Sequence, residues 1–491
     1  MKKFLSLLLS SAILAMSLCA CDPAVDDVPK DETESATGAE TTPHGIPEEL
    51  DFGGSGFNIA YMRNDNDKML DLYYVEEYSS DNMAAAVFSR NTKTEQYLNV
   101  DINAFSTITY EELRTLFQSG DDIYQHYVLS GQNNSTYLID GLLYNIDMLP
   151  YIDLDADWWN KEVTDSLRMG KYTYLMVSDY LITDPLCMYF NRNMITDNNL
   201  EDPYAMVKAG TWTTDKVMDM AIAVRNDKDG DNSYYGDDDI VGIFTGDTYI
   251  YTGFMTGAAR FMTERDENNR VVSNFANEMT YSLLNKIYRL YENPGSYRST
   301  ILPEHKADRD TAGSAGDFAN GHALFTLGMI NQLETMATLD GFTAGVVPFP
   351  KFTEDQDRYY SLDWTGALAV PSTIKNKELV GAVIEYLAWE SGNEVVPTYY
   401  NKLLKTRYSA DPETREMLEL IFDTVYLEVG ITYLLFTGFT GCTYICNMPL
   451  TGSTSYAAFF RVDKKDVKDS LEDFYAGLDA IELQEEASMN P

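Results

Sequence analysis

The chain has 491 residues and a formal net charge of −41, with 77 acidic against 36 basic residues. This balance excludes nucleic acid as a partner, because phosphate binding needs a basic face that releases counterions. The four histidines and five cysteines form none of the usual zinc or catalytic patterns, and the hydrolase motifs H-E-x-x-H and G-x-S-x-G do not occur.

Residues 1–20 have the anatomy of an export signal, with Lys2 and Lys3 before an apolar stretch too short to span a bilayer comfortably. The tetrad Leu18-Cys19-Ala20-Cys21 resembles the lipobox of bacterial lipoproteins. This resemblance implies that Cys21 carries a diacylglyceryl group and becomes the mature N-terminus. An ordinary signal peptide with a chance cysteine is the alternative. The sequence has no other apolar stretch of about eighteen residues, so we expect no further membrane crossing.

Residues 21–50 predict a flexible acidic tether. They contain nine acids, one lysine and four prolines, a composition that cannot bury enough apolar surface to offset its ordering entropy. The roughly 440 residues that follow exceed a single core, so we expect two lobes. A lipid, a tether and a folded body together predict a protein held at the extracytoplasmic face of the cell membrane.

The folded body begins with strand and helix patterns in alternation. Strand patterns cover residues 57–62, 100–104 and 122–129, and helical spacing covers 83–98 and 110–118. This alternation predicts an α/β fold with a parallel sheet covered by helices. Ligands of such sheets bind at the carboxyl ends of the strands.

The later sequence repeats this theme. Residues 171–191 contain two strand-like stretches, and residues 212–225 form an amphipathic helix pattern. Further along the chain, strand-like and helical segments alternate over residues 323–328, 331–339, 345–351, 361–370 and 377–391.

The order and spacing of four segments resemble the extracellular solute-binding proteins of ABC importers, in the family 1 group that contains the maltose-binding type. The segments are 147–159 (DMLPYIDLDADWW), 210–226 (GTWTTDKVMDMAIAVRN), 345–351 and 369–391. The resemblance implies a two-lobed periplasmic-binding-protein-like (type II) fold with hinge strands between the lobes. It also implies a monomer without enzymatic activity, which closes on a solute and delivers it to the permease subunits of an importer.

This layout gives lobe boundaries. Residues 51–185 and 352–400 are expected in lobe 1, residues 186–351 and 401–480 in lobe 2, and residues 481–491 in a tail. The first crossing between the lobes is expected near 186–191, and the return near 345–351.

A sugar requires aromatic rings that stack on its C–H surfaces and carboxylates that accept from its hydroxyls. The candidate ligand residues combine these types near strand ends and the hinge: Trp364, Asp363, Asp179, Tyr180, His126, Tyr127 and Tyr251. Trp158 and Trp159 are assigned to packing. We expect a carbohydrate solute, an oligosaccharide first. A non-sugar solute, a glycoside-processing enzyme and a sensor remain the alternatives.

Residues 227–239 (DKDGDNSYYGDDD) concentrate acids in one short loop. Calcium requires six to eight oxygen ligands, which acids at every second position of a tight loop provide. Aligned as an EF-hand-like loop, the expected ligands are Asp227, Asp229, Asp231, Ser233, Tyr235 and Asp238. The loop departs from that pattern at Asn232, where glycine is usual, and at Asp238, where glutamate is usual. Asp237 and Asp239 are the alternatives to Asp238 as the last ligand. The sequence thus predicts a structural calcium site, with a solvated acidic turn as the alternative.

Overall fold

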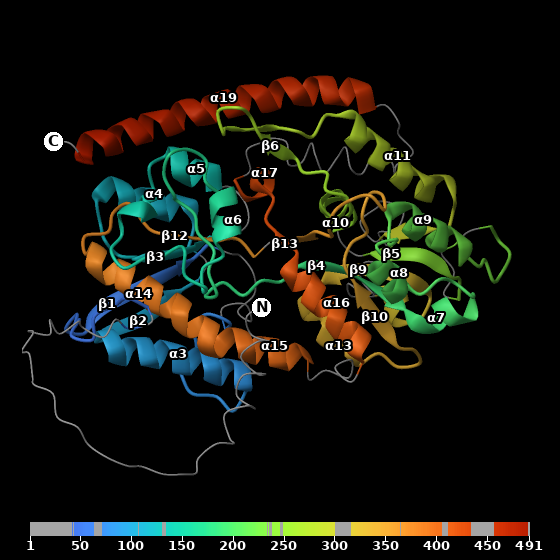
Figure 1. Cartoon of the computed structure of the whole chain (residues 1–491), viewed down its shortest axis with the longest axis horizontal. Helices are drawn as coiled ribbons and strands as arrows, with labels where there is room; N and C mark the ends of the chain where they lie inside the picture. The colour runs from blue at the N-terminus through green and yellow to red at the C-terminus, as the bar shows by residue number, and fades with distance from the viewer. Residues whose placement is uncertain are drawn as a thin grey trace, which may run out of the picture.

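The computed structural model describes residues 42, 44–62, 71–106, 108–129, 134–232, 234, 238–245, 249–299, 316–363, 365–404, 411–433 and 456–489. Cys21 and most of the acidic tether lie outside these residues. None of the helices in the described ranges is both long enough and apolar enough to cross a membrane. Figure 1 shows two α/β lobes side by side, with the long helix α19 running along both.

Lobe 1 is built on a four-stranded sheet in the order β12-β3-β1-β2. β1, β2 and β3 are parallel, and β12 joins β3 from a later part of the chain in the antiparallel direction. The elements of this lobe are β1 (Ser55–Tyr61), α3 (Asn82–Leu98), β2 (Val100–Phe105), α4 (Tyr110–Ser119), β3 (His126–Leu129), α5 (Asn134–Ile139), η1 (Ile146–Met148), α6 (Lys161–Ser166), β12 (Ala367–Ala369), α14 (Lys377–Glu390) and η4 (Ser391–Val395).

Local sequence signals set the ends of the first two helices. Asp81 caps α3 by accepting from the N–H groups of Met83 and Ala84. Thr109 and Glu112 form a reciprocal capping box at the start of α4, and Gly120 ends that helix with φ +69°. These caps satisfy backbone groups that have no partner inside a helix. The helices predicted at 83–98 and 110–118 are therefore confirmed to within one residue.

Lobe 2 is built on a five-stranded sheet in the order β10-β4-β9-β5-β8. β4 is antiparallel to both β10 and β9, and β5 is parallel to β9 and β8. Its elements are β4 (Leu186–Asn191), α7 (Arg192–Asp197), α8 (Pro203–Ala209), α9 (Thr214–Ala223), β5 (Val241–Thr245), α10 (Tyr249–Gly257), β6 (Thr263–Arg265), β7 (Val271–Ser273), α11 (Glu278–Glu292), β8 (Tyr297–Ser299), α12 (Gly316–Ala319), β9 (Ala323–Met329), η3 (Ile330–Gln332), α13 (Leu333–Ala337) and β10 (Ala344–Val347).

Two predicted extended segments differ in the structure. Within 171–191 only β4 is a regular strand, since the earlier stretch meets the lobe 1 sheet at a single bridge between Met176 and Leu368. The segment 361–370 divides into β11 (Ser361–Leu362) and β12. Gly366, with φ +102°, turns the chain between them in a conformation that other residues rarely adopt.

The C-terminal elements connect the two lobes: α15 (Val396–Leu404), α16 (Pro412–Asp423), β13 (Val425–Tyr426), α17 (Val429–Thr432) and α19 (Tyr456–Met489). α16 packs against β10 of lobe 2. On α19, the Tyr475 hydroxyl accepts from the Val271 N–H of lobe 2 at 2.6 Å. About two helical turns further on, Glu482 accepts from the Lys171 N–H of lobe 1 at 2.6 Å. α19 therefore contacts both lobes, as Figure 1 also shows.

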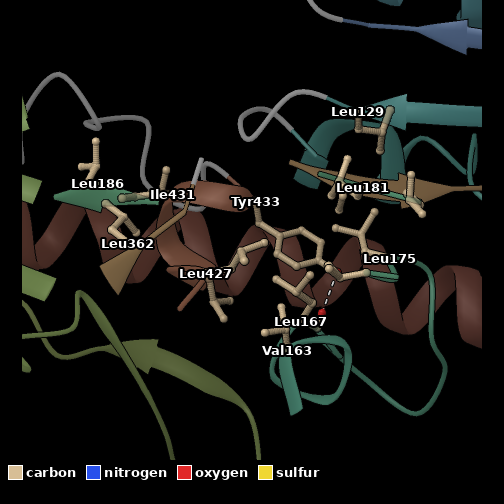
Figure 2. Close-up of a cluster of buried hydrophobic side chains, with 14 of the residues drawn as sticks. Leu129, Val163, Leu167, Leu175, Leu181, Leu186, Leu362, Leu427, Ile431 and Tyr433 are labelled. Atoms are coloured by element: carbon tan, nitrogen blue, oxygen red, sulfur yellow. Dashed lines mark hydrogen bonds between the residues drawn. The ribbon is translucent and has the colours of Figure 1, made fainter. Parts of the chain in front are cut away.

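The apolar core of lobe 1 continues into the segments that join the lobes. Leu186, at the start of β4, and Leu362, at the end of β11, belong to the same buried cluster as Leu175. Figure 2 shows this cluster together with Tyr433, whose hydroxyl donates to the Leu167 carbonyl oxygen at 2.7 Å. The connecting segments are thus held by apolar packing at their lobe 1 ends.

Candidate functional site

The chain passes between the lobes just before β4, through β11, through α15 and through β13. β11 and β13 pair in parallel as two-residue strands, with Ser361 opposite Val425. Residues 186–191 and 344–347, near which the sequence placed the crossings, are neighbouring strands of the lobe 2 sheet. The observed crossings flank them. Short strands of this kind are suited to a hinge, because a few residues absorb the change in backbone angles.

Two buried carboxylates brace the hinge. Asp184 precedes β4 and Asp363 follows β11, and they are 6% and 4% exposed. The Asp184 N–H donates to Asp363 Oδ1 at 3.1 Å, and the Asn331 N–H donates to Asp184 Oδ1 at 2.9 Å. Asp363 also accepts from both the N–H and the hydroxyl of Thr365. The structure therefore uses Asp363, predicted as a ligand residue, to hold crossing segments together.

A third buried acid, Glu428, was not predicted and lies just after β13. It accepts from the Met262 N–H at 3.1 Å and from the Thr263 hydroxyl at 2.9 Å, both beside the β6–β7 hairpin. Burial raises the pKa of Glu428 to about 7. Its only sequence signal was an acid within the apolar run that follows β13. Glu428 ties this hairpin of lobe 2 to the returning chain.

Tyr180 lies inside lobe 1 rather than on its surface. Its hydroxyl is 3.1 Å from that of Tyr61, and the Arg90 guanidinium carbon lies 4.5 Å from its ring centroid. Arg90 is fully buried, and its other donors reach Asn91 and the Tyr73 carbonyl oxygen. Burial lowers the pKa of Arg90. These contacts make Tyr180 part of a buried aromatic and cationic cluster, which organises the strand ends of lobe 1.

His126 and Tyr127 are also core residues in this structure, at 1% and 4% exposure. His126 Nδ1 is 3.0 Å from the Ala369 carbonyl oxygen on β12. Burial lowers the pKa of His126 to about 4, so the imidazole is neutral at pH 7. Both residues fix β12 against β3 and present little surface to a ligand.

Asp179 differs from the other predicted acids. Its backbone N–H donates to the Trp158 carbonyl oxygen at 2.9 Å, but its carboxylate has no hydrogen-bond partner among the described residues. The carboxylate faces Gly392 of η4, where an added Cβ would lie 2.5 Å from Asp179 Oδ2. Burial raises the pKa of Asp179 to about 7. This partly exposed carboxylate next to the hinge is available to accept hydrogen bonds from a ligand.

Trp158 and Trp159 share one acceptor, which the sequence did not indicate. The two indole N–H groups donate to the two carboxylate oxygens of Glu385 on α14, at 2.8 and 2.9 Å. The Asp153 N–H donates to the same carboxylate at 3.2 Å. Burial raises the pKa of Glu385 to about 7. Trp158 is thereby held in place beside Asp179, and its position matches the predicted packing role.

Other predicted residues fall outside what the structure describes. Trp364 lies outside the described residues, and so does the side chain of Tyr251 on α10. Both stay predictions.

The acidic loop brings some of its predicted ligands together. Carboxylate oxygens of Asp227, Asp229 and Asp239 lie within 4.8 Å of one another. Asp231 and Asp238 are exposed and do not belong to this group, while Ser233 and Tyr235 lie outside the described residues. Asn232 has φ +63°, the left-handed conformation that the loop requires at its glycine position. Asp239, rather than Asp238, is the acid that converges with Asp227 and Asp229.

No protein-family model and no curated protein matches the sequence. Solved structures do match. A galacto-N-biose/lacto-N-biose I-binding protein of an ABC transporter from Bifidobacterium longum, in complex with lacto-N-biose, has a TM-score of 0.57 at 13% identity, covering 86% of this chain and 98% of that chain.

Two further structures resemble the chain over similar lengths. An ABC substrate-binding protein from Listeria monocytogenes, in complex with cycloalternan, has a TM-score of 0.52 at 15% identity, covering 86% of this chain and 98% of that one. A family 1 extracellular solute-binding protein from Bifidobacterium longum subsp. infantis has a TM-score of 0.51 at 13% identity, covering 86% and 99%. This likeness shows the fold: the chain has the two-lobed periplasmic-binding-protein-like α/β fold, as the sequence predicted.

Proposed function

We propose that this chain, with the fold of the solute-binding proteins, is the lipid-anchored binding subunit of an ABC importer. It captures a carbohydrate between its lobes and delivers it to a permease. An oligosaccharide is the solute class that we favour. The observation that carries the proposal is the architecture of two α/β sheets joined by two-residue hinge strands. Proteins that share it over almost their whole length were solved with lacto-N-biose and cycloalternan.

Asp179 is the solute contact that the geometry supports best. A hydroxyl of a bound sugar would donate to its carboxylate, which no described residue occupies, and Trp158 lies beside it. Desolvation by the bound sugar strengthens such a hydrogen bond. We also propose Trp364 and Tyr251 as the aromatic contacts, on the sequence argument that rings stack on the C–H faces of a sugar.

The test is a thermal-shift screen of the mature protein against oligosaccharides, monosaccharides, peptides and amino acids. A solute that binds the native state raises Tm by mass action. We expect the shift from carbohydrates. If peptides or amino acids alone raise Tm, the solute is not a sugar and the binding function stands.

A glycoside-processing enzyme is the rival function. It requires two carboxylates that flank the scissile bond at a fixed separation, whereas the hinge acids Asp184 and Asp363 accept hydrogen bonds from the chain itself. Incubation with chromogenic glycosides separates the two functions. A binding protein returns the sugar unchanged, and steady release of the chromophore would overturn our proposal.

The lipid anchor is proposed on Cys21. The full precursor expressed in a bacterium with lipoprotein processing should fractionate with membranes, and the Cys21→Ser variant should be released or remain unprocessed. Mass spectrometry of the N-terminal peptide provides the direct readout, since the anchor adds acyl chains to that residue alone.

A structural calcium ion is proposed at the acidic loop. The convergence of Asp227, Asp229 and Asp239 fits a hard cation, which takes carboxylate oxygens. Backbone N–H groups already donate to Asp227 and to Asp239 Oδ1, so the ion would share these oxygens with the loop. When bound, it would stiffen the connection between α9 and β5.

A further inference from the structure

A pocket lies between the first half of α3 and the η4–α15 segment, on the side of lobe 1 that joins lobe 2. Its volume is about 520 Å³, within the range of roughly 300–1,000 Å³ that small-molecule sites occupy. It shares no lining residue with the surface around Asp179.

One wall of the pocket is a single face of α3. Asn82, Ala86 and Ser89 line it at helical spacing, so their side chains lie above one another on the same face. Alanine in the middle of this face leaves room between the polar side chains. Thr398 and Asn401 of α15, three residues apart and therefore neighbours on that helix, line the opposite wall with two more polar side chains.

The charges of the pocket are already paired within the protein. Glu394 accepts from the Ser89 hydroxyl at 3.0 Å and from Lys93 Nζ at 2.6 Å. Lys402 pairs with Glu334 of α13 at 3.3 Å. An anionic or a cationic ligand would have to compete with these ion pairs. The pocket therefore does not select a charged molecule.

Three neutral polar groups of the pocket are not paired in this way. The side chains of Asn82, Thr398 and Asn401 have no hydrogen-bond partner in the described part of the chain. Tyr78 adds an aromatic ring that is 72% exposed, an unusual exposure for such a large apolar surface. Phe88 meets the Tyr78 ring edge-on, with 6.1 Å between the ring centroids.

We infer that this pocket binds a small, uncharged, hydroxyl-rich molecule the size of one or two sugar rings. Two amides and a hydroxyl supply donors and acceptors to its hydroxyl groups, and the Tyr78 ring covers its C–H face. The inference goes beyond the proposed function, since it assigns a second solute site outside the surface around Asp179.

The test uses the mature protein with D-glucose, maltose and myo-inositol as neutral probes, and sodium phosphate and choline chloride as charged probes. Binding is measured by isothermal titration and by saturation-transfer NMR. Asn401→Ala and Tyr78→Ala remove one amide and the ring from exposed positions. Tyr281→Ala on α11, another exposed tyrosine, is the matched control, and Asp179→Asn reports the interlobe site.

We expect at least one neutral probe to bind, and each pocket variant to weaken its Kd by about three- to tenfold, the equivalent of one hydrogen bond or stacking contact. Tyr281→Ala should leave that Kd unchanged. Asp179→Asn should weaken only a binding event that the pocket variants leave intact. The inference is overturned if the pocket variants change the Kd of no neutral probe, or if a charged probe binds in the pocket more tightly than the neutral ones. It is also overturned if Asp179→Asn, and neither pocket variant, abolishes binding of the neutral probes. The last result would support the proposed interlobe site while removing the second one.

Discussion

Asp179 and Asp184 lie five residues apart on the segment that leads from lobe 1 into β4, yet the structure uses them in opposite ways. Asp184 is buried, accepts from the Asn331 N–H and donates its own N–H to Asp363. Asp179 is partly exposed, and its carboxylate has no partner among the described residues. Asp184 holds the hinge because its carboxylate accepts from a backbone N–H group. The Asp179 carboxylate has no such donor in the part of the chain that the structure describes and is available to a solute.

The largest expected effect is a loss of stability when the hinge acid Asp363 is replaced. Asp363→Ala removes the carboxylate that accepts from the buried Asp184 and Thr365 N–H groups. We expect the free energy of unfolding to fall by about 3 kcal/mol, since each buried unsatisfied group costs about 1–3 kcal/mol. Denaturant unfolding of the mature protein measures this change.

Asp363→Asn is the matched control, because its amide keeps one acceptor oxygen for these N–H groups. It should lose clearly less stability than the alanine variant. A solute affinity that collapses in Asp363→Ala at unchanged stability would contradict the bracing role and return Asp363 to the ligand site.

The next largest effect is a loss of solute affinity when Asp179 is replaced. Asp179→Asn removes the charged acceptor that we propose for a sugar hydroxyl. We expect the Kd for the solute to rise about tenfold, since a hydrogen bond to a charged group contributes about 1.5–3 kcal/mol and asparagine retains part of it. Asp197→Asn, an exposed acid on α7, serves as the control. Equal affinities in the two variants would exclude Asp179 from the site.

The same variant predicts a pH-dependent change in stability. Burial raises the pKa of Asp179 to about 7, above its ordinary value of about 4. The folded state therefore favours the protonated carboxyl. The stability that protonation of Asp179 contributes is fully present below about pH 4 and is lost as the pH rises through 7. Asp179→Asn should stabilise the protein at pH 8 and have little effect at pH 4.5 in denaturant unfolding. An equal effect at both pH values would contradict the raised pKa.

Local patterns sufficed for much of the fold. The alternation of strands and helices from residue 57 to 129 predicted the parallel β1-β2-β3 core of lobe 1, because caps such as Thr109 with Glu112 act within a few residues. The division of 361–370 was not predicted, since it depends on Gly366 joining one sheet to another. Such a turn is decided by tertiary pairing that no short window contains.

The site was less accessible to sequence reasoning. Acids and aromatics near strand ends include residues that hold the hinge, core residues and the proposed ligand contacts, and only their three-dimensional neighbours distinguish these roles. Tyr180 is a core residue because Arg90, ninety positions earlier, stacks on its ring. Glu385 was missed because its partners, Trp158 and Trp159, are more than 220 residues away. Partners at this separation leave no periodic signal.

The smallest expected effect is a calcium-dependent change in Tm at the acidic loop. There, as at Asp184, backbone N–H groups donate to carboxylates, but the loop lies at the surface. Millimolar calcium should raise Tm by a few degrees, through binding to the native state. Asp229→Asn should remove most of this shift, because Asp229 belongs to the converging group, whereas Asp238→Asn changes an exposed neighbour outside it. If both variants respond to calcium as the wild type does, the loop is an acidic turn held by its own N–H groups.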